Sequence, residues 1–390
     1  MAGYRWFGAA AILGVLAACA IEQAPGPPPA PRAAAPSAPS GASTQPPDPV
    51  AAAPRSMPKS RWVAVRWSDL PGWHDDGVIH AWPALLKSCE RANAEWANAC
   101  GSAKALADPN EARVRDWLQR HLQPYRIEAV DGRSEGMITG YYEPLIEASR
   151  APKPGFGVPL HAPPGDLGTR KPWWTRAQIE SQPAARAALR GREIAYVADP
   201  LDALVLQIQG SGRLLLTEPD GRRHVVRAAF AGHNDHPYRA VARWLVDQGA
   251  FTFDQASWPA IKSWARAHPA RVGEMLNANP RYVFFREEPL PDPSIGATGA
   301  QGVPLTPGRS IAVDRESVPY GTPIWIDAVE PAVNGAPARL LQRLVVAQDT
   351  GSAIVGAVRA DYFWGWGEAA DEYAGRMKHP LRMWALVPRN

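Results

Sequence analysis

The sequence predicts a mainly β fold made of barrels, with a helical lead-in and a helical interlude. Short runs rich in β-branched and aromatic residues, bounded by Gly, Pro and Asp, recur along most of the chain. These runs do not alternate regularly with helical patterns, which argues against a doubly wound parallel sheet. The helical patterns are instead collected in two places, one before the strands begin and one between two groups of strands.

The first helical region is predicted from Trp82 to Leu122, and one of its helices is expected to begin at Asp108-Pro109, a cap followed by a first-turn proline. Strands are predicted in IEAV, MITGYYEPLIEA and EIAYVAD, and as successive strands in LVLQIQGSGRLLLTEPDGRRHVVRAAFAG, turning at GSG and EPDG. Helices return in PYRAVARWLVDQG, SWPAIKSWARA and PARVGEMLNANP. The last strands are YVFFRE, RSIAVD, TPIWIDAV, RLVVAQDTG and LRMWALVP.

The N-terminus, MAGYRWFGAAAILGVLAACA, has the layout of a secretory signal, with Arg5 ahead of an apolar run from Phe7 to Ala18. That run is shorter than the about 20 residues that cross a bilayer. LAAC resembles a bacterial lipobox, in which cleavage precedes Cys19 and that cysteine is lipidated, so residues 1–19 are predicted to be a lipoprotein signal peptide with its lipobox. The alternative is an ordinary signal peptide with an incidental cysteine. An aspartate directly after the lipidated cysteine is the familiar signal for retention in the inner membrane, and this chain has Ala20 there. We therefore expect an outer-membrane lipoprotein facing the periplasm of a Gram-negative bacterium.

Residues 20–60 are dominated by Pro, Ala and Ser and show no apolar periodicity, so they are predicted to be a disordered spacer. The folded part is expected to begin near Arg61. The formal net charge of +4 is mild, and no Lys/Arg block or basic stripe interleaved with aromatic residues occurs. The sequence therefore predicts no nucleic-acid partner.

Cys89 and Cys100 are expected to form a disulfide in an oxidising compartment, with two buried thiols as the alternative. No histidine accompanies them at zinc spacing. His233 and His236 in AGHNDHPYR lack a third ligand at a useful spacing. We therefore expect no metal and no cofactor.

The segment from Gln207 to Gly212 reads QIQGSG. The phosphate-binding interpretation fails, because a third glycine is missing and the chain is predicted to continue as strand. Gln207 and Gln209 are predicted on one face of a strand, from which their amides could meet sugar hydroxyls, although a plain β-turn is the simpler interpretation. In GYYEP, one of Tyr141 and Tyr142 could pack while the other lines a groove.

Three aspartates are placed near strand ends within one strand-rich segment. Asp314 ends RSIAVD, Asp349 ends RLVVAQD, and Asp361 lies in RADYFWGWG. Such acids could converge at one mouth of a barrel, where burial and like charge would raise a pKa. They could equally be three turn residues, and the pattern alone leaves both interpretations open.

Six segments in this order resemble the membrane-bound lytic murein transglycosylase A (MltA) family, from about Thr139 to the C-terminus. They are GYYEP, QGSGRL, FAGHNDHPYR, LNANPRYVFFRE, SIAVDRESVPYGTP and QDTGSAIVGAVRADYFWGWG. The resemblance implies a double-psi β-barrel catalytic domain with a three-aspartate segment, formed here by residues 61–142 and 280–390. It also implies a second, smaller β-barrel domain inserted at residues 143–279, with glycan bound in the groove between the two.

The resemblance assigns roles to particular residues. Asp361 matches the catalytic acid/base, and Asp349 and Asp314 match its two companions. The implied sugar-contacting residues are Thr139, Tyr141, Gln209 and Ser211. Ser352 departs from the family pattern, which has a second glycine there; a side chain is acceptable at that position if its φ stays negative.

The function implied by the resemblance is cleavage of the β-1,4 bond between MurNAc and GlcNAc in peptidoglycan without water, which leaves 1,6-anhydroMurNAc ends. The implied partners are peptidoglycan glycan strands and, through the lipid anchor, the outer membrane; we expect a monomer that could join wall-synthesis complexes. Two alternatives stay open. One is a hydrolytic muramidase in which Asp349 activates water, and the other is a non-catalytic peptidoglycan-binding lipoprotein.

Overall fold

The computed structural model describes residues 52–253 and 255–389. The predicted signal peptide, the lipidation site Cys19 and most of the predicted spacer lie outside these residues. No helix in the described part of the chain is long and apolar enough to cross a membrane.

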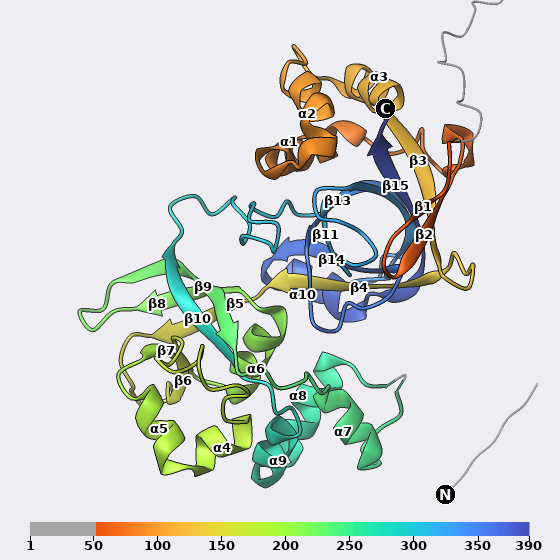
Figure 1. Cartoon of the computed structure of the whole chain (residues 1–390). Helices are drawn as coiled ribbons and strands as arrows, with labels where there is room; N and C mark the ends of the chain where they lie inside the picture. The colour runs from red at the N-terminus through yellow and green to blue at the C-terminus, as the bar shows by residue number, and fades with distance from the viewer. Residues whose placement is uncertain (1–51, 254, 390) are drawn as a thin grey trace, which may run out of the picture. The chain divides into compact units, whose positions relative to one another are not determined.

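Six strands of a nine-stranded sheet close into a ring in the order β15–β12–β13–β11–β14–β4, because β4 also pairs with β15. The ring is the first barrel, drawn mostly in blue in Figure 1. Its strands are β4 (Gly136–Glu143), β11 (Ser310–Val313), β12 (Pro323–Glu330), β13 (Arg339–Asp349), β14 (Arg359–Trp366) and β15 (Lys378–Pro388). Most of its pairs are antiparallel, whereas β4–β14 and β11–β13 are parallel. Residues more than 200 positions apart in the chain therefore become direct neighbours.

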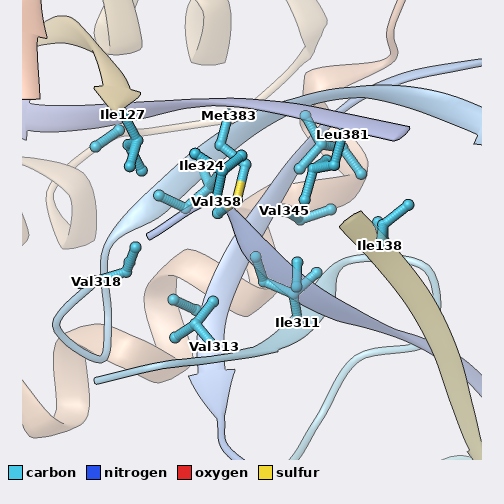
Figure 2. Close-up of a cluster of buried hydrophobic side chains, with 14 of the residues drawn as sticks. Ile127, Ile138, Ile311, Val313, Val318, Ile324, Val345, Val358, Leu381 and Met383 are labelled. Carbon is cyan, nitrogen blue, oxygen red and sulfur yellow. The ribbon is translucent and has the colours of Figure 1, made fainter. Parts of the chain in front are cut away.

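The interior of this barrel is filled by aliphatic side chains, as alternation along each strand requires. Ile138, Ile311, Val345 and Met383 come from four different strands and are all fully buried. Figure 2 shows these side chains gathered between the strands that carry them. The barrel is thus a packed core, and a ligand has to bind outside it.

The sheet is extended beyond β15 by β3 (Leu122–Ala129), β2 (Ser60–Ala64) and β1 (Arg55–Ser56), so ordered strand begins slightly before the predicted start at Arg61. The lead-in helices are α1 (Trp82–Ser88), α2 (Ala97–Lys104) and α3 (Glu111–His121). A disulfide joins Cys89 to Cys100. The predicted helix start at Asp108-Pro109 is wrong: Asn110 caps α3 by accepting a hydrogen bond from the Arg113 amide.

A second, six-stranded sheet has the order β10–β9–β8–β5–β7–β6, and its edge strands β10 and β6 lie next to each other. Its strands are β5 (Leu145–Ser149), β6 (Val158–His161), β7 (Glu193–Val197), β8 (Gly212–Thr217), β9 (Arg223–His233) and β10 (Val283–Pro289). The predicted fold class, mainly β with two barrel-like sheets, is confirmed. The boundaries implied by the resemblance place the YVFFRE strand, which follows residue 280, in the first barrel. It pairs instead with β9 in the second sheet.

Six helices accompany the second sheet: α4 (Arg176–Ser181), α5 (Pro183–Leu189), α6 (Pro200–Gln209), α7 (Val241–Asp247), α8 (Trp258–Ala267) and α9 (Val272–Asn277). The predicted strand containing Gln207 and Gln209 is wrong, because these residues end helix α6. Asp199 caps the helix, Pro200 opens it, and Gly210 closes it with a φ of +82°, which glycine adopts without strain. The sequence of α6 is a short apolar run, and such a run does not distinguish a buried helix from a buried strand.

Candidate active site

Strand pairing aligns two of the three predicted aspartates across four neighbouring strands. On β14, Asp361 is opposite Thr139 of β4 on one side and Ala312 of β11 on the other. Ala312 is in turn opposite Asp349 of β13. Residues directly opposite each other point to the same face of a sheet, so Thr139, Asp361 and Asp349 share one face.

A register shift between β11 and β13 is needed for this alignment. Ile311 is opposite Ala347, and without the shift Ala312 would be opposite Gln348. The shift leaves the Gln348 side chain facing helix α1, where its NH₂ group donates to the Ala84 carbonyl, while its amide oxygen accepts a hydrogen bond from the Ser310 hydroxyl at 2.5 Å. Asp349 is thereby brought to the face that carries Asp361, which is a common use of an irregular strand next to a site.

The sequence predicts Asp361 near a strand end or in a loop, but in the structure it lies inside β14. Its Oδ1 accepts a hydrogen bond of 2.5 Å from the Thr139 hydroxyl. Burial raises the pKa of Asp361 to about 6, and the negative charge of Asp349 acts in the same direction. The Thr139 hydrogen bond and the positive charge of Arg359 oppose this rise without cancelling it.

Asp349 is held through both of its carboxylate oxygens. Tyr141 donates its phenolic hydrogen to Oδ2 at 3.0 Å, and the Ala300 amide donates to Oδ1 at 3.0 Å. Burial raises the pKa of Asp349, although these hydrogen bonds and one from the Thr350 amide act against the rise. The Asp349 carboxyl group is therefore held close to Asp361, with little freedom to turn.

Asp314 does not join the other two aspartates in a cavity wall. Its Oδ2 accepts from the Gly356 amide at 3.0 Å and its Oδ1 from the Glu316 amide at 3.1 Å, while Lys59 contacts Oδ2 at 3.2 Å. Burial alone would raise its pKa, but these contacts outweigh burial and lower it. Asp314 thus anchors the loop that runs from Asp349 to β14.

Ser352 lies in the same loop, at the position where it departs from the family pattern. Among the described residues other than glycine, positive φ occurs at Asp108, Asp235 and Asn334, so Ser352 keeps a negative φ. The serine is therefore accommodated without backbone strain.

Two cavities meet at Asp361, one of about 780 Å³ and one of about 380 Å³. Both are lined by Thr139, Tyr141, Gln209, Asp349 and Asp361. The larger cavity is also lined by Ser211, so all four predicted sugar-contacting residues lie in its wall. The acid with the raised pKa therefore lies between two spaces, each of the size that ordinary ligand pockets have, about 300–1,000 Å³.

The predicted sugar-contacting residues differ in how firmly they are held. The Gln209 side-chain oxygen accepts a hydrogen bond from the Tyr142 amide at 3.1 Å, while its NH₂ group has no partner among the described residues. From the described part of the chain, the Ser211 hydroxyl accepts one long hydrogen bond, 3.4 Å, from the Phe230 amide. Both side chains retain hydrogen-bonding capacity for a ligand with many hydroxyls.

Several residues of the cavity walls were not predicted. Phe230, Arg281 and Arg286 line only the larger cavity, and Tyr238 lines both. Arg359, also in the larger wall, was detectable, because it precedes Asp361 by two residues and a strand places such residues on one face. The others depend on how the two sheets approach, which no local pattern encodes. Within residues 52–253 and 255–389, no cluster of three His, Cys, Asp or Glu could hold a metal ion.

Comparisons with known proteins show which sequences and structures this chain is similar to. A family model described as the MltA specific insert domain matches residues 137–286, and a 3D domain model matches residues 309–387. The chain is 32% identical to the membrane-bound lytic murein transglycosylase A of Escherichia coli (strain K12), over 70% of this chain and 71% of that protein.

Among solved structures, the lytic transglycosylase LtgG of Burkholderia pseudomallei is 43% identical, with a TM-score of 0.58, over 88% of this chain and all (100%) of that one. E. coli MltA with bound chitohexaose is 26% identical, with a TM-score of 0.62, over 80% of this chain and 90% of that one.

Proposed function

The chain belongs to the membrane-bound lytic murein transglycosylase A family, and on this premise we propose that it cleaves peptidoglycan between MurNAc and GlcNAc without water. The family relationship makes the chain a lytic transglycosylase enzyme. The proposed product carries a 1,6-anhydroMurNAc end. The observation that carries the proposal is the position of Asp361, a carboxyl group with a raised pKa at the junction of two cavities.

The proposed reaction uses Asp361 twice. The protonated carboxyl group first donates its proton to the oxygen of the β-1,4 bond, which breaks as GlcNAc leaves with that oxygen. The C1 atom of MurNAc becomes oxocarbenium-like. The Asp361 carboxylate then takes the proton from the C6 hydroxyl of the same sugar, and O6 bonds to C1. Asp361 ends the cycle protonated, as it began, and no water is consumed.

A pKa near neutrality suits this double role, because an effective acid must hold its proton before the step and accept one after it. Burial supplies most of the rise in the pKa of Asp361. We assign Asp349 the role of an electrostatic partner, since its charge raises the pKa of Asp361 further. Asp349 is less suited to activate water as in a hydrolase, because both of its oxygens already accept hydrogen bonds.

The two cavities support glycan binding on both sides of the scissile bond. Tyr141 and Gln209 line both spaces, and Ser211 lines the larger. We propose that these polar groups bind sugar hydroxyls in this chain; a relative from E. coli was solved with chitohexaose bound. Attachment to the outer membrane through Cys19, the monomeric state and any wall-synthesis partner belong to the same proposal, and Cys19 lies outside the described residues.

The test uses the full chain in detergent, incubated with purified sacculi, with mass spectrometry of the released muropeptides. We expect muropeptides one water lighter than their reducing-end counterparts, and a loss of at least about 10²–10⁴ in rate for Asp361→Asn. Asp116→Asn is the matched control, because Asp116 is half-exposed on α3 and, among the described residues, its one ion pair is with Arg120. Reducing-end products would establish the hydrolase instead. Sacculi that bind the protein but stay intact would establish the binding lipoprotein.

A further inference from the structure

Two consecutive hydrogen bonds connect Arg359 to Asp361. Arg359 Nη2 donates to the Thr139 hydroxyl oxygen at 2.9 Å, and this hydroxyl donates to Asp361 Oδ1 at 2.5 Å. Arg359 and Asp361 are two residues apart on β14, and Thr139 is directly opposite Asp361 on β4. The three side chains are thus carried by two paired strands of the barrel.

The direction of the second hydrogen bond follows from what a hydroxyl group can do. A threonine hydroxyl has one hydrogen to donate and two lone pairs that accept. Arginine can only donate, so Arg359 occupies a lone pair of Thr139 and cannot take its hydrogen. In the described part of the chain, Asp361 Oδ1 is the one acceptor found for that hydrogen. The Thr139 hydroxyl therefore points its hydrogen at Oδ1.

We propose that Arg359 is a positioning residue that acts through Thr139 to keep the acid proton of Asp361 on Oδ2. With Oδ1 accepting from Thr139, the proton of the neutral carboxyl group belongs on the other oxygen. No described residue forms a hydrogen bond with Oδ2, and Asp361 lines both cavities. The same arrangement serves the carboxylate, so Asp361 can lose and regain its proton without any change in Thr139. This inference rests on the proposed function of Asp361.

Arg359 is itself firmly placed. Its Nη1 donates to the Ala360 carbonyl and, at 3.4 Å, to the Met137 carbonyl. Burial lowers the pKa of the Arg359 guanidinium, while the neighbouring Asp361 raises it. An arginine loses its proton only far above neutral pH. Arg359 is therefore a permanent positive charge near the acid.

Other charged and titratable groups also face Asp361. Asp349 approaches from β13 and Tyr141 from β4, and Lys378 of β15 is opposite Thr139 and lines the smaller cavity. Arg359 differs from these groups because it has two effects. It carries a positive charge, and it orients the Thr139 hydroxyl, which donates a hydrogen bond to Asp361. Removing Arg359 should therefore change two separate quantities, the pKa of Asp361 and the rate of the step.

The first test does not depend on activity. The pKa of Asp361 is measured by ¹³C NMR titration of the carboxyl carbons in the full chain, and Asp361→Asn identifies its signal. We expect a higher pKa for Asp361 in Arg359→Gln and in Thr139→Val, because each removes an interaction that lowers it. Arg120→Gln, on the exposed side of α3, is the matched control and should leave this pKa unchanged. An unchanged pKa in both variants would overturn the proposal.

The second test is a double-mutant cycle on kcat for release of muropeptides from sacculi. We expect Arg359→Gln and Thr139→Val each to lower kcat by about tenfold or more, because the acid proton is no longer directed. The double variant should lose no more than the worse single variant. Arg359→Lys should keep the alkaline limb of the pH profile near that of the parent chain, with reduced kcat. Thr139→Val nearly preserves shape, so it keeps the test informative if Arg359→Gln folds poorly.

The two tests separate the possible failures. Additive losses in the cycle would show that Arg359 acts without Thr139 and would overturn the positioning role. A parent chain that releases no anhydro product, yet shows the expected NMR shifts, would refute the proposed function while leaving the hydrogen-bond arrangement intact.

Discussion

The raised pKa of Asp361 makes a quantitative prediction for the pH dependence of the reaction. An aspartate with the ordinary value of 3.8 would be protonated in fewer than about one molecule in 1,000 at pH 7. With a pKa of about 6, about one molecule in ten carries the proton at that pH. The environment of Asp361 therefore increases the population of the competent acid by roughly 100-fold.

The perturbation is pH itself. Since the free enzyme must hold the proton, kcat/KM should be level below about pH 6 and fall by about tenfold for each unit above it. Initial rates of muropeptide release from sacculi between pH 5 and pH 9, at constant ionic strength, measure this directly. Constant ionic strength matters because the wall and the protein are both charged.

Thr139→Val supplies an internal check on this reasoning. The lost hydrogen bond had lowered the pKa of Asp361, so the falling limb of the variant should move to higher pH. A rate that stays level up to pH 8 would refute the assignment of Asp361 as the acid. A rate that already falls by about tenfold per unit from pH 5 upward, with no level region, would show that burial does not raise its pKa in solution.

Two further predictions concern stability. The pKa of Asp361 is higher in the folded than in the unfolded chain, so its contribution to the free energy of unfolding is favourable at low pH and is lost as pH rises through about 6. Above that pH the buried carboxylate destabilises the fold, and Asp361→Asn should remove this cost of at most about 3 kcal/mol. The melting temperature of the Asp361→Asn variant should exceed that of the parent chain, and the difference should be larger at pH 8 than at pH 5. An equal difference at both pH values would contradict this prediction. Glu143→Gln should lower the free energy of unfolding by about 3–5 kcal/mol, because buried Arg213 and Arg227 both pair with Glu143. Glu147→Gln, an exposed residue paired with Arg223, is the control and should change the urea midpoint little.

The sequence by itself determined the features that depend on local composition. The strand runs of the last third, the turn at EPDG and the helices after Pro237 all follow from residue type and spacing. The signal peptide and the spacer stay predictions from composition, because the former and most of the latter lie outside the described residues. Motifs in a fixed order were specific enough to indicate the family before any contact was known.

Only the tertiary structure decided which residues meet. The run before Gly210 is apolar in either conformation, and packing made it helix α6 rather than a strand. Asp314, Asp349 and Asp361 look alike in sequence, yet pairing across β4, β14, β11 and β13 brings two of them into the cavity walls and leaves Asp314 to anchor a loop. Strand pairing joins residues distant in the chain, and a register shift reverses which side chain faces the site. The raised pKa of Asp361 comes from that assembly, because burial is a property of the fold and not of the residue.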